Sequence, residues 1–262
     1  MPRQGFDRIH KIWGHARWTP PLCGRTRVVI SDLAREGDRD RYWCAQFAPP
    51  ALRPAMLAVL AFAVELTAVP SKTTREPMMS ALRFAWWREG LDAIFSEGRV
   101  PQTPTLEALA SAVRSHELPR EILDQMIDAA EMSASGGAED LQGLVALATT
   151  EGAGPLTLWL RILEAESRAT QTAVTAAGTA WALSRRAFAR TDRDAVLAAA
   201  LVEVERGRSQ RNDVLDTALP ALLPMALAVR SLRALCRGRD PARDNRALRQ
   251  LELLGNALLS RY

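Results

Sequence analysis

Three acidic residues, Asp124, Asp128 and Glu131, have a spacing that could serve metal chemistry. Side chains three or four residues apart lie on one face of a helix, and Mg²⁺ prefers carboxylate oxygens as ligands. Acids held in this way on two facing helices could bind the Mg²⁺ that neutralises a diphosphate leaving group. A solvated helix face explains the same spacing, and it is the interpretation we favour for this cluster.

A second candidate is the stretch from Arg83 to Asp92, which contains the pattern Arg-x-x-Trp-Trp-Arg-x-x-x-Asp. Its charged and aromatic members are candidate binding residues if the helix faces a cavity, and they are Arg83, Trp86, Trp87, Arg88 and Asp92. Two plainer interpretations compete with this one. Tryptophans on a nearly buried helix usually fill the core, and Arg88 with Asp92 has the i, i+4 spacing of a surface ion pair.

The other chemically competent side chains stand apart from one another. Glu65 interrupts an apolar run, so it either marks a cavity or pairs with an arginine, because buried acids need partners. Arg185 and Arg186 could meet a phosphate directly. Neither histidines nor cysteines have the spacing of a triad or a metal site; they are His10, His15, His116, Cys23, Cys44 and Cys236. We therefore predict no catalytic residue, no metal site and no cofactor, and small buried hydrophobic roles for the cysteines.

Helices must position all of these residues. Ala, Leu and Arg are abundant and β-branched runs are scarce, which predicts an all-α fold built as a single helical bundle. We expect a basic irregular arm at 1–30 and one helical domain at 31–262. The expected helices begin at Ser31 and continue at 39–47, 51–69, 77–95, after Thr103, from 119 to 133, and at 139–149, 156–166, 167–190, 191–207, 214–237 and 242–261.

Prolines and glycines set several of these predicted helix limits. Pro70 is expected to end the helix at 51–69, and Pro77 to occupy the first position of the next helix. Gly152, Gly154 and Pro155 are expected to break or kink the chain before Leu156. The helices at 51–69 and 75–95 are expected at the centre of the bundle.

Basic charge gathers towards both ends of the chain. Residues 1–30 hold six basic side chains against one acid, and residues 230–249 hold seven arginines against two acids. Such ends could meet anionic lipid or could simply be solvated, and we predict no nucleic-acid partner. The longest apolar runs, at 55–64 and 218–229, are shorter than the roughly 20 residues that a bilayer requires, so no transmembrane span is predicted. A stripe of Leu248, Leu251 and Leu258, opposite Arg249, is expected to pack on the bundle rather than lie in a membrane interface.

Several short motifs resemble those of the squalene/phytoene synthase family. They are Asp38-Arg-Asp-Arg-Tyr42, Phe47-Ala-Pro49, Leu60-Ala-Phe62, Glu76-Pro77-Met78 and the Trp-Trp stretch described above. The likeness covers roughly residues 30–200, and it is greatest for the branch that contains the mitochondrial complex I assembly factor. It implies a helical bundle of the isoprenoid synthase type. It also implies that Glu65, Arg83, Trp86, Trp87, Arg88, Asp92 and Arg185 surround a remnant of the family's cavity.

The departures from the family pattern concern the acids. Active members carry an Asp-Asp-x-x-Asp element where this chain has Thr67, Ala68 and Ser71, and an Asn-x-x-x-Asp element where it has Arg185 and Ala189. A diphosphate without its cations would place concentrated negative charge in a low-dielectric cavity, which is costly. The resemblance with these losses implies a non-catalytic relative that acts as an assembly or scaffold factor for a respiratory membrane complex.

Two alternatives stay open at this point. One is an isoprenoid-diphosphate synthase of the prenyltransferase type, and the other is a module that binds an isoprenoid or lipid without reacting. The implied partners are subunits or assembly intermediates of the respiratory complex, with an anionic membrane surface or an isoprenoid lipid as further partners. The implied location is cytoplasmic, peripheral on the inner face of the membrane, or the mitochondrial matrix side in a eukaryote.

Overall fold

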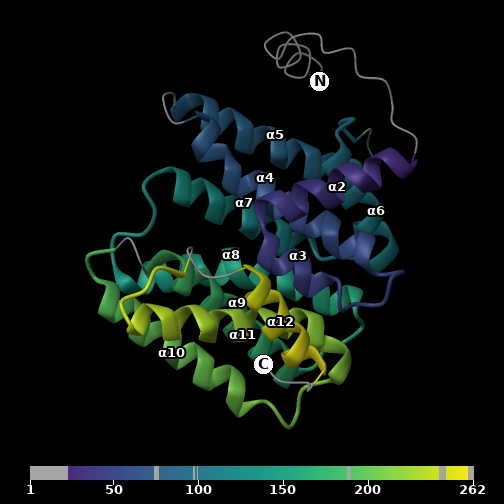
Figure 1. The fold of residues 1–262 in the computed structure, drawn as a ribbon. Helices are drawn as coiled ribbons and strands as arrows, with labels where there is room; N and C mark the ends of the chain where they lie inside the picture. Colours follow the sequence, from purple (N-terminus) through teal and green to yellow (C-terminus); the bar gives the residue numbers. More distant parts are fainter. Residues whose placement is uncertain are drawn as a thin grey trace.

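Helices supply all the regular structure in the part of the chain that the computed structural model describes, residues 23–73, 77–96, 98, 100–187, 190–241 and 246–258. The all-α prediction is confirmed. In chain order (Figure 1) the helices are α2 (Cys23–Gly37), α3 (Arg39–Ala45), α4 (Arg53–Thr73), α5 (Pro77–Phe95), α6 (Pro104–His116), α7 (Arg120–Ala134), α8 (Leu141–Ile162), α9 (Arg168–Arg186), α10 (Arg193–Ser209), α11 (Leu219–Cys236) and α12 (Arg246–Leu258), with a short 3-10 turn, η2, at Asp216–Ala218.

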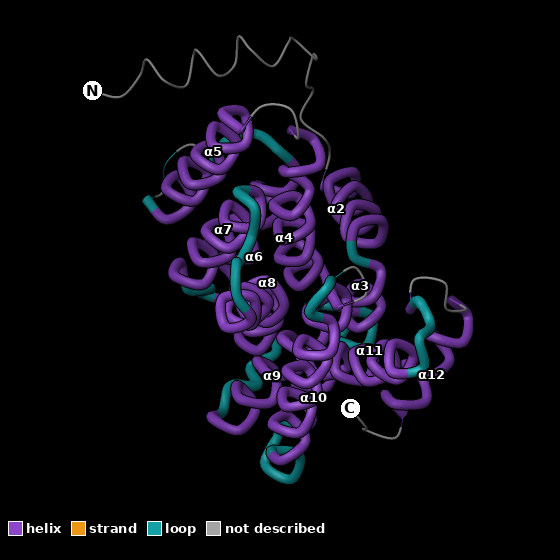
Figure 2. Tube along the Cα trace, turned by 90° about the vertical axis from the view of Figure 1, so that its left-hand side faces the viewer, coloured by secondary structure: helices purple, strands orange, loops and turns teal. Residues whose placement is uncertain are grey.

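The centre of the bundle is formed by α4, α8 and α9. Every residue from Met56 to Val64 on α4 is buried, as the apolar sequence predicts for a helix with neighbours on all sides. The indole nitrogen of Trp159 on α8 donates a hydrogen bond of 3.0 Å to the Met56 carbonyl. Without this partner the nitrogen would be buried and unpaired, which is energetically costly. Figure 2 shows α2 and α5 towards one end of the bundle and α10 towards the other.

The prediction that the helix near 75–95 is also central is wrong. α5 lies at the edge of the bundle (Figures 1 and 2), where it packs against α4, α6 and α7. Met78 is 74% exposed and Leu82 is 46% exposed on its outer side. α5 contains more apolar residues than it buries, so its composition predicted a deeper position in the bundle than the one it has.

A close crossing of α8 and α9 replaces the break that was predicted at Gly152 to Pro155. α8 runs without interruption through this stretch. A Cβ placed on Gly152 would collide with the carbonyl of Gly178 on α9, and a Cβ on Gly178 would lie 2.5 Å from the backbone of Ala153. The glycines therefore serve close backbone approach between two helices and do not end one of them.

Other helix limits agree with or correct the sequence predictions. Thr103 caps α6 by accepting a hydrogen bond from the Leu106 amide, as predicted. α2 begins at Cys23, eight residues before the predicted start at Ser31, and residues 1–22 of the predicted arm lie outside the described residues. α4 continues through Pro70 to Thr73. A proline removes one backbone hydrogen bond, and burial of Leu66 and Val69 just before it holds the helix together.

The last helix, α12, faces the opposite way from the prediction. Leu248 is 52% exposed and Leu251 is 63% exposed, whereas Leu253 is buried against the bundle. Arg249 turns inward and binds Asp40 of α3 at 2.8 Å. The ion pair, together with Leu253, fixes the orientation of α12 and leaves a leucine face on the surface.

One helical stretch of the described chain, Asp216–Cys236, is long and apolar enough to cross a membrane by length and composition. The uninterrupted apolar runs at 55–64 and 218–229 predicted no such segment, because each is too short to cross a bilayer. In the structure, 61% of the apolar window of this stretch is buried inside the bundle. The core helix of a soluble protein passes the same test, so the observation is weak support for a span.

The crossing of α8 and α9 predicts a sharp difference between two glycines. Gly178→Ala should lower the free energy of unfolding by about 1–3 kcal/mol, because backbone atoms cannot move aside as a flexible side chain can. Gly255→Ala on α12 is the matched control. No heavy atom lies within 4 Å of its added Cβ, so alanine should raise stability by up to about 1 kcal/mol. Urea unfolding midpoints measure both changes, and equal effects would contradict the close crossing.

Candidate functional site

The two tryptophans of the Trp-Trp stretch have different environments. Trp87 is fully buried, and its ring meets Phe62 of α4 edge-on at 5.4 Å between centroids and meets Trp86 edge-on at 4.8 Å. Edge-to-face aromatic contacts of this kind stabilise a core. Trp86 is only partly buried. Trp87 therefore fills the core, which is the plainer of the two sequence interpretations.

Arg88 and Asp92 bind residues of α7 and not each other. Arg88 lies 2.7 Å from Asp128 and 2.6 Å from Glu131. Arg120 of α7 completes the network by binding Asp92 at 2.5 Å and Asp124 at 3.0 Å. The three acids of the suspected metal cluster are thus partners of arginines on a solvated face, as favoured from the sequence. Because these side chains are 36–65% exposed, each pair adds little stability, and together they hold α5 to α7.

Glu65 has a partner that sequence reasoning did not consider. The hydroxyl of Thr105 at the start of α6 donates a 2.9 Å hydrogen bond to its carboxylate. Neither of the expected arrangements, a cavity or an arginine partner, accounts for this contact. Glu65 is partly buried, so the bond links α4 to α6 near the bundle surface.

The predicted set of cavity residues divides into two groups. Arg83, Trp86, Trp87, Arg88 and Asp92 lie on α5, which packs against α4, α6 and α7. Arg185 lies on α9, which packs against α8, α10 and α11. α5 thus packs against α4, the helix of Glu65, whereas the helix of Arg185 packs against a different set of neighbours.

Arg185 belongs to a cluster that sequence reasoning did not assemble. Its guanidinium carbon lies 5.0 Å from the centre of the Trp181 ring, one turn earlier on α9, and its Nη1 lies 3.7 Å from Asp40. Arg41 of α3 also contacts the Trp181 ring, with its guanidinium carbon at 4.2 Å. Stacking of a guanidinium on an indole ring is a favourable cation–π contact. We call these residues, with Asp38 and Arg249, the α3–α9 cluster.

The most deeply buried member of the α3–α9 cluster is Arg41, which is 5% exposed. Its Nε donates to Asp38 at 2.5 Å, and its Nη1 donates to the carbonyls of Glu151 and Gly152, each at 3.2 Å. Asp38 also caps α3 by accepting a hydrogen bond from the Arg41 amide. A buried charge is tolerable only when paired and hydrogen-bonded in this way. Arg41 thereby joins α3 to α8 at the point where α8 crosses α9.

A neighbouring ion pair extends the cluster along α8 and α9. Arg186 binds Glu151, whose other carboxylate oxygen accepts a 2.5 Å hydrogen bond from Ser133 of α7. The Asp38-Arg-Asp-Arg-Tyr42 motif held the signal that could have predicted these contacts. Its acids and Arg41 stand at a helix start, but their partners on α8, α9 and α12 are more than a hundred residues away in sequence.

Of the two cysteines whose environments are described, one matches the prediction. Cys44 is buried, and burial raises the pKa of its thiol well above the ordinary value, with Asp40 and Asp38 raising it further. It is therefore an unreactive core residue. Cys236 is exposed on the last turn of α11, which corrects the prediction of a buried role.

The residues that the resemblance assigns to the family's magnesium positions do not fit that ion. Thr67 turns its hydroxyl back to the carbonyls of Ala63 and Val64 on its own helix. Ala68 has no ligand atom, and Arg185 brings positive charge to the place of an amide. Ala189 and the side chain of Ser71 lie outside the described residues. Among the residues whose side chains are described, no three His, Cys, Asp or Glu are grouped so that they could hold a metal ion.

Comparison with known proteins gives a family and a fold. The squalene/phytoene synthase family pattern matches residues 34–187. Two solved structures have the same architecture. A dehydrosqualene synthase in complex with ligand superposes with a TM-score of 0.75 over 90% of this chain and 96% of its own, at 13% identity. Squalene synthase HpnC from Alicyclobacillus acidocaldarius gives a TM-score of 0.67 over 82% and 94%, at 17% identity.

Curated relatives with similar sequences have a different description. NADH dehydrogenase (ubiquinone) complex I, assembly factor 6, from Bos taurus is 30% identical over 133 residues, which is 50% of this chain and 39% of that protein. The human protein is 26% identical over 138 residues, with 48% and 39% covered. The Drosophila melanogaster homolog is 28% identical over 116 residues, with 43% and 35% covered. The matched part is therefore about two fifths of these relatives.

The α3–α9 cluster predicts a large difference between two arginines. Arg41→Met should lower the free energy of unfolding by about 3–5 kcal/mol, because it leaves the buried Asp38 carboxylate without its cation. Arg35→Met, which breaks the exposed pair with Asp32, should change it by no more than about 1 kcal/mol. Guanidinium chloride unfolding followed by circular dichroism measures both. A loss below about 1 kcal/mol for Arg41→Met would contradict the structural role of the buried pair.

Proposed function

Because this chain belongs to the squalene/phytoene synthase family, we propose that it retains the family's helical scaffold without its catalysis and acts in the assembly of respiratory complex I. In this proposal the protein is a scaffold that contacts subunits or assembly intermediates of the complex. It works on the inner face of the cytoplasmic membrane, or on the matrix side in a eukaryote.

The assembly role is supported by the curated relatives, which are named as complex I assembly factors in several animals. Their likeness covers about half of this chain. Since the match spans only about two fifths of those relatives, their role is carried to this chain as part of the proposal.

The observation that carries the non-catalytic part is the environment of Arg185. This residue stands where active members have an amide that serves the metal site, and it contacts Trp181 and Asp40. A cation in that place would repel Mg²⁺. On α4, Thr67 bonds to its own helix and supplies no carboxylate at the other position that the resemblance assigns to the metal site.

The membrane location is supported by two surface features. The exposed leucines of α12 are Leu248, Leu251 and Leu254, and the stretch at 230–249 supplies the exposed arginines Arg233, Arg237 and Arg239. Apolar surface combined with basic residues favours reversible binding to anionic membranes. The two rival functions, a prenyltransferase and a module that binds an isoprenoid, differ from this proposal in their products and ligands.

The non-catalytic part predicts the outcome of an enzyme assay. Purified protein with farnesyl or geranylgeranyl diphosphate and Mg²⁺ should release no pyrophosphate above the rate without protein, because the carboxylates that would hold the cations are replaced. An active dehydrosqualene synthase assayed in parallel is the control. Steady pyrophosphate release that a chelator abolishes would overturn the non-catalytic proposal in favour of the prenyltransferase.

The assembly role predicts the effect of disrupting the gene in its native host. Fully assembled NADH:quinone oxidoreductase, measured by native gel and in-gel activity, should fall, and carotenoid and hopanoid levels should stay unchanged. Complementation with the unaltered chain should restore the complex, whereas Arg41→Met should restore it poorly because less folded protein accumulates. Loss of isoprenoid products with an intact respiratory complex would replace the assembly role with the enzyme.

A further inference from the structure

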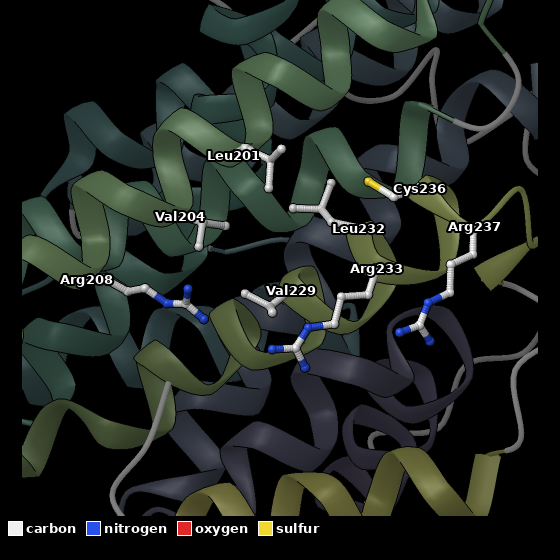
Figure 3. A pocket seen from close by; sticks show the side chains of 8 residues that line it. All are labelled: Leu201, Val204, Arg208, Val229, Leu232, Arg233, Cys236 and Arg237. Atoms are coloured by element: carbon white, nitrogen blue, oxygen red, sulfur yellow. The ribbon is translucent and has the colours of Figure 1, made fainter.

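A groove opens between α10 and α11 on a part of the molecule that the α3–α9 cluster does not include. Its volume is about 300 Å³, at the lower end of the range for ligand pockets. Figure 3 shows Leu201 and Val204 of α10 facing Val229 and Leu232 of α11, so the floor of the groove is apolar. The two apolar residues on each helix are three positions apart, which places them on one face of that helix.

Three arginines border this apolar floor. Figure 3 shows the guanidinium groups of Arg208, Arg233 and Arg237 spread along the length of the groove. All three are exposed, and none forms an ion pair with a described residue. The nearby acid Glu203 is turned inward and pairs with Arg206. The groove therefore has uncompensated positive charge beside apolar surface.

Other arginines of this region show that the arrangement is not general. Arg230, on the same helix as the groove, binds Glu252 of α12, and Arg249 binds Asp40 of α3. Arg230 and Arg249, which face neighbouring helices, thus form ion pairs with acids, whereas the arginines bordering the groove do not. Arginine forms two-point hydrogen bonds with phosphate oxygens, so a phosphate is the anion that best matches these groups.

We propose that the α10–α11 groove binds an anionic membrane phospholipid. The phosphate lies against Arg208 and Arg233, with Arg237 nearby, and the upper part of an acyl chain lies against the exposed surface of Leu201 and Val229, above the buried Val204 and Leu232. A soluble phosphate would satisfy the arginines alone and leave the accessible surface of Leu201 and Val229 in water. Leu201, which is 48% exposed in the groove, would be covered by hydrocarbon, and burial of such surface is favourable.

A phospholipid site in this groove would give the membrane location of the proposed function a defined point of attachment. The site rests on the proposed function only for its biological setting. The groove lies near the end of the bundle formed by α10 and α11, away from α5 (Figure 1). Binding there would turn this end towards the membrane and leave the α5–α7 face for other contacts. Vesicle binding tests the groove, and the native gel of the respiratory complex tests the assembly role, so the two can fail separately.

The first test is flotation of the full chain with vesicles of phosphatidylcholine containing phosphatidylglycerol. Arg208→Ser/Arg233→Ser should weaken binding about 10- to 30-fold, from the attraction of each arginine for an anionic surface. Arg114→Ser/Arg168→Ser removes two exposed arginines from other helices and should weaken binding less than about threefold. Thermal melting checks that both variants are folded.

The second test uses a thiol that lies in the groove itself. Cys236 lines the groove and is exposed, whereas Cys44 is buried. In a Cys23→Ser protein, phosphatidylglycerol vesicles should slow the maleimide labelling of Cys236 at least fivefold. Phosphatidylcholine vesicles and soluble glycerol phosphate should leave the rate within about twofold. This measurement needs no arginine variant, so it holds even if the double variant is unstable.

Each result bears on the proposal. Weaker vesicle binding by the Arg208→Ser/Arg233→Ser protein alone, together with slower labelling of Cys236 by maleimide, would support a phospholipid site. An equal loss of vesicle binding in the two double variants would overturn the proposal in favour of general charge attraction. Protection by glycerol phosphate as strong as by vesicles would overturn the lipid and leave a soluble anion site, and unaltered labelling in the presence of vesicles would exclude occupancy of the groove.

Discussion

The contact between α8 and α9 sets the arrangement of the rest of the bundle. Gly152 and Gly178 let the two backbones meet without side chains between them. Pro155 has no amide hydrogen to offer the Glu151 carbonyl four residues earlier on α8, and Arg41 donates to that carbonyl and to the carbonyl of Gly152. Arg41 in turn rests on Trp181, three residues beyond Gly178 on α9. The position of α3, and through it that of Asp38 and Asp40, therefore depends on how closely two other helices approach.

The α3–α9 cluster holds its positive charges next to acids of its own. Arg41 and Arg185 share one tryptophan, and Asp38 and Asp40 balance them from α3. The acids of this region are thus used for internal pairing. The charges of the cluster are therefore balanced by one another, without a bound cation.

The helical fold, the buried α4 and the Thr103 cap could be predicted because each depends on residues close in sequence. The errors came from long-range contacts. Gly152 was taken as a helix breaker, since nothing near it in sequence indicates that Gly178 will pass alongside. The orientation of α12 was inverted because its leucine stripe is a local pattern, whereas the bond from Arg249 to Asp40 is not. Of the candidate site, the surface role of Arg88 and Asp92 was foreseeable, but their partners on α7 were not.

The pairing of Arg249 with Asp40 joins residues 209 positions apart. Contacts of such long sequence separation form late in folding, since the entropy of closing the intervening loop must be overcome first. On a ribosome that adds 5–20 residues per second, roughly 10–40 seconds separate the synthesis of these two side chains. Throughout that interval α3 holds a carboxylate whose closest cation is not yet made. The nascent protein therefore passes through a stage in which Asp40 can pair with Arg185 but not yet with Arg249, and synthesis of α12 completes this pairing.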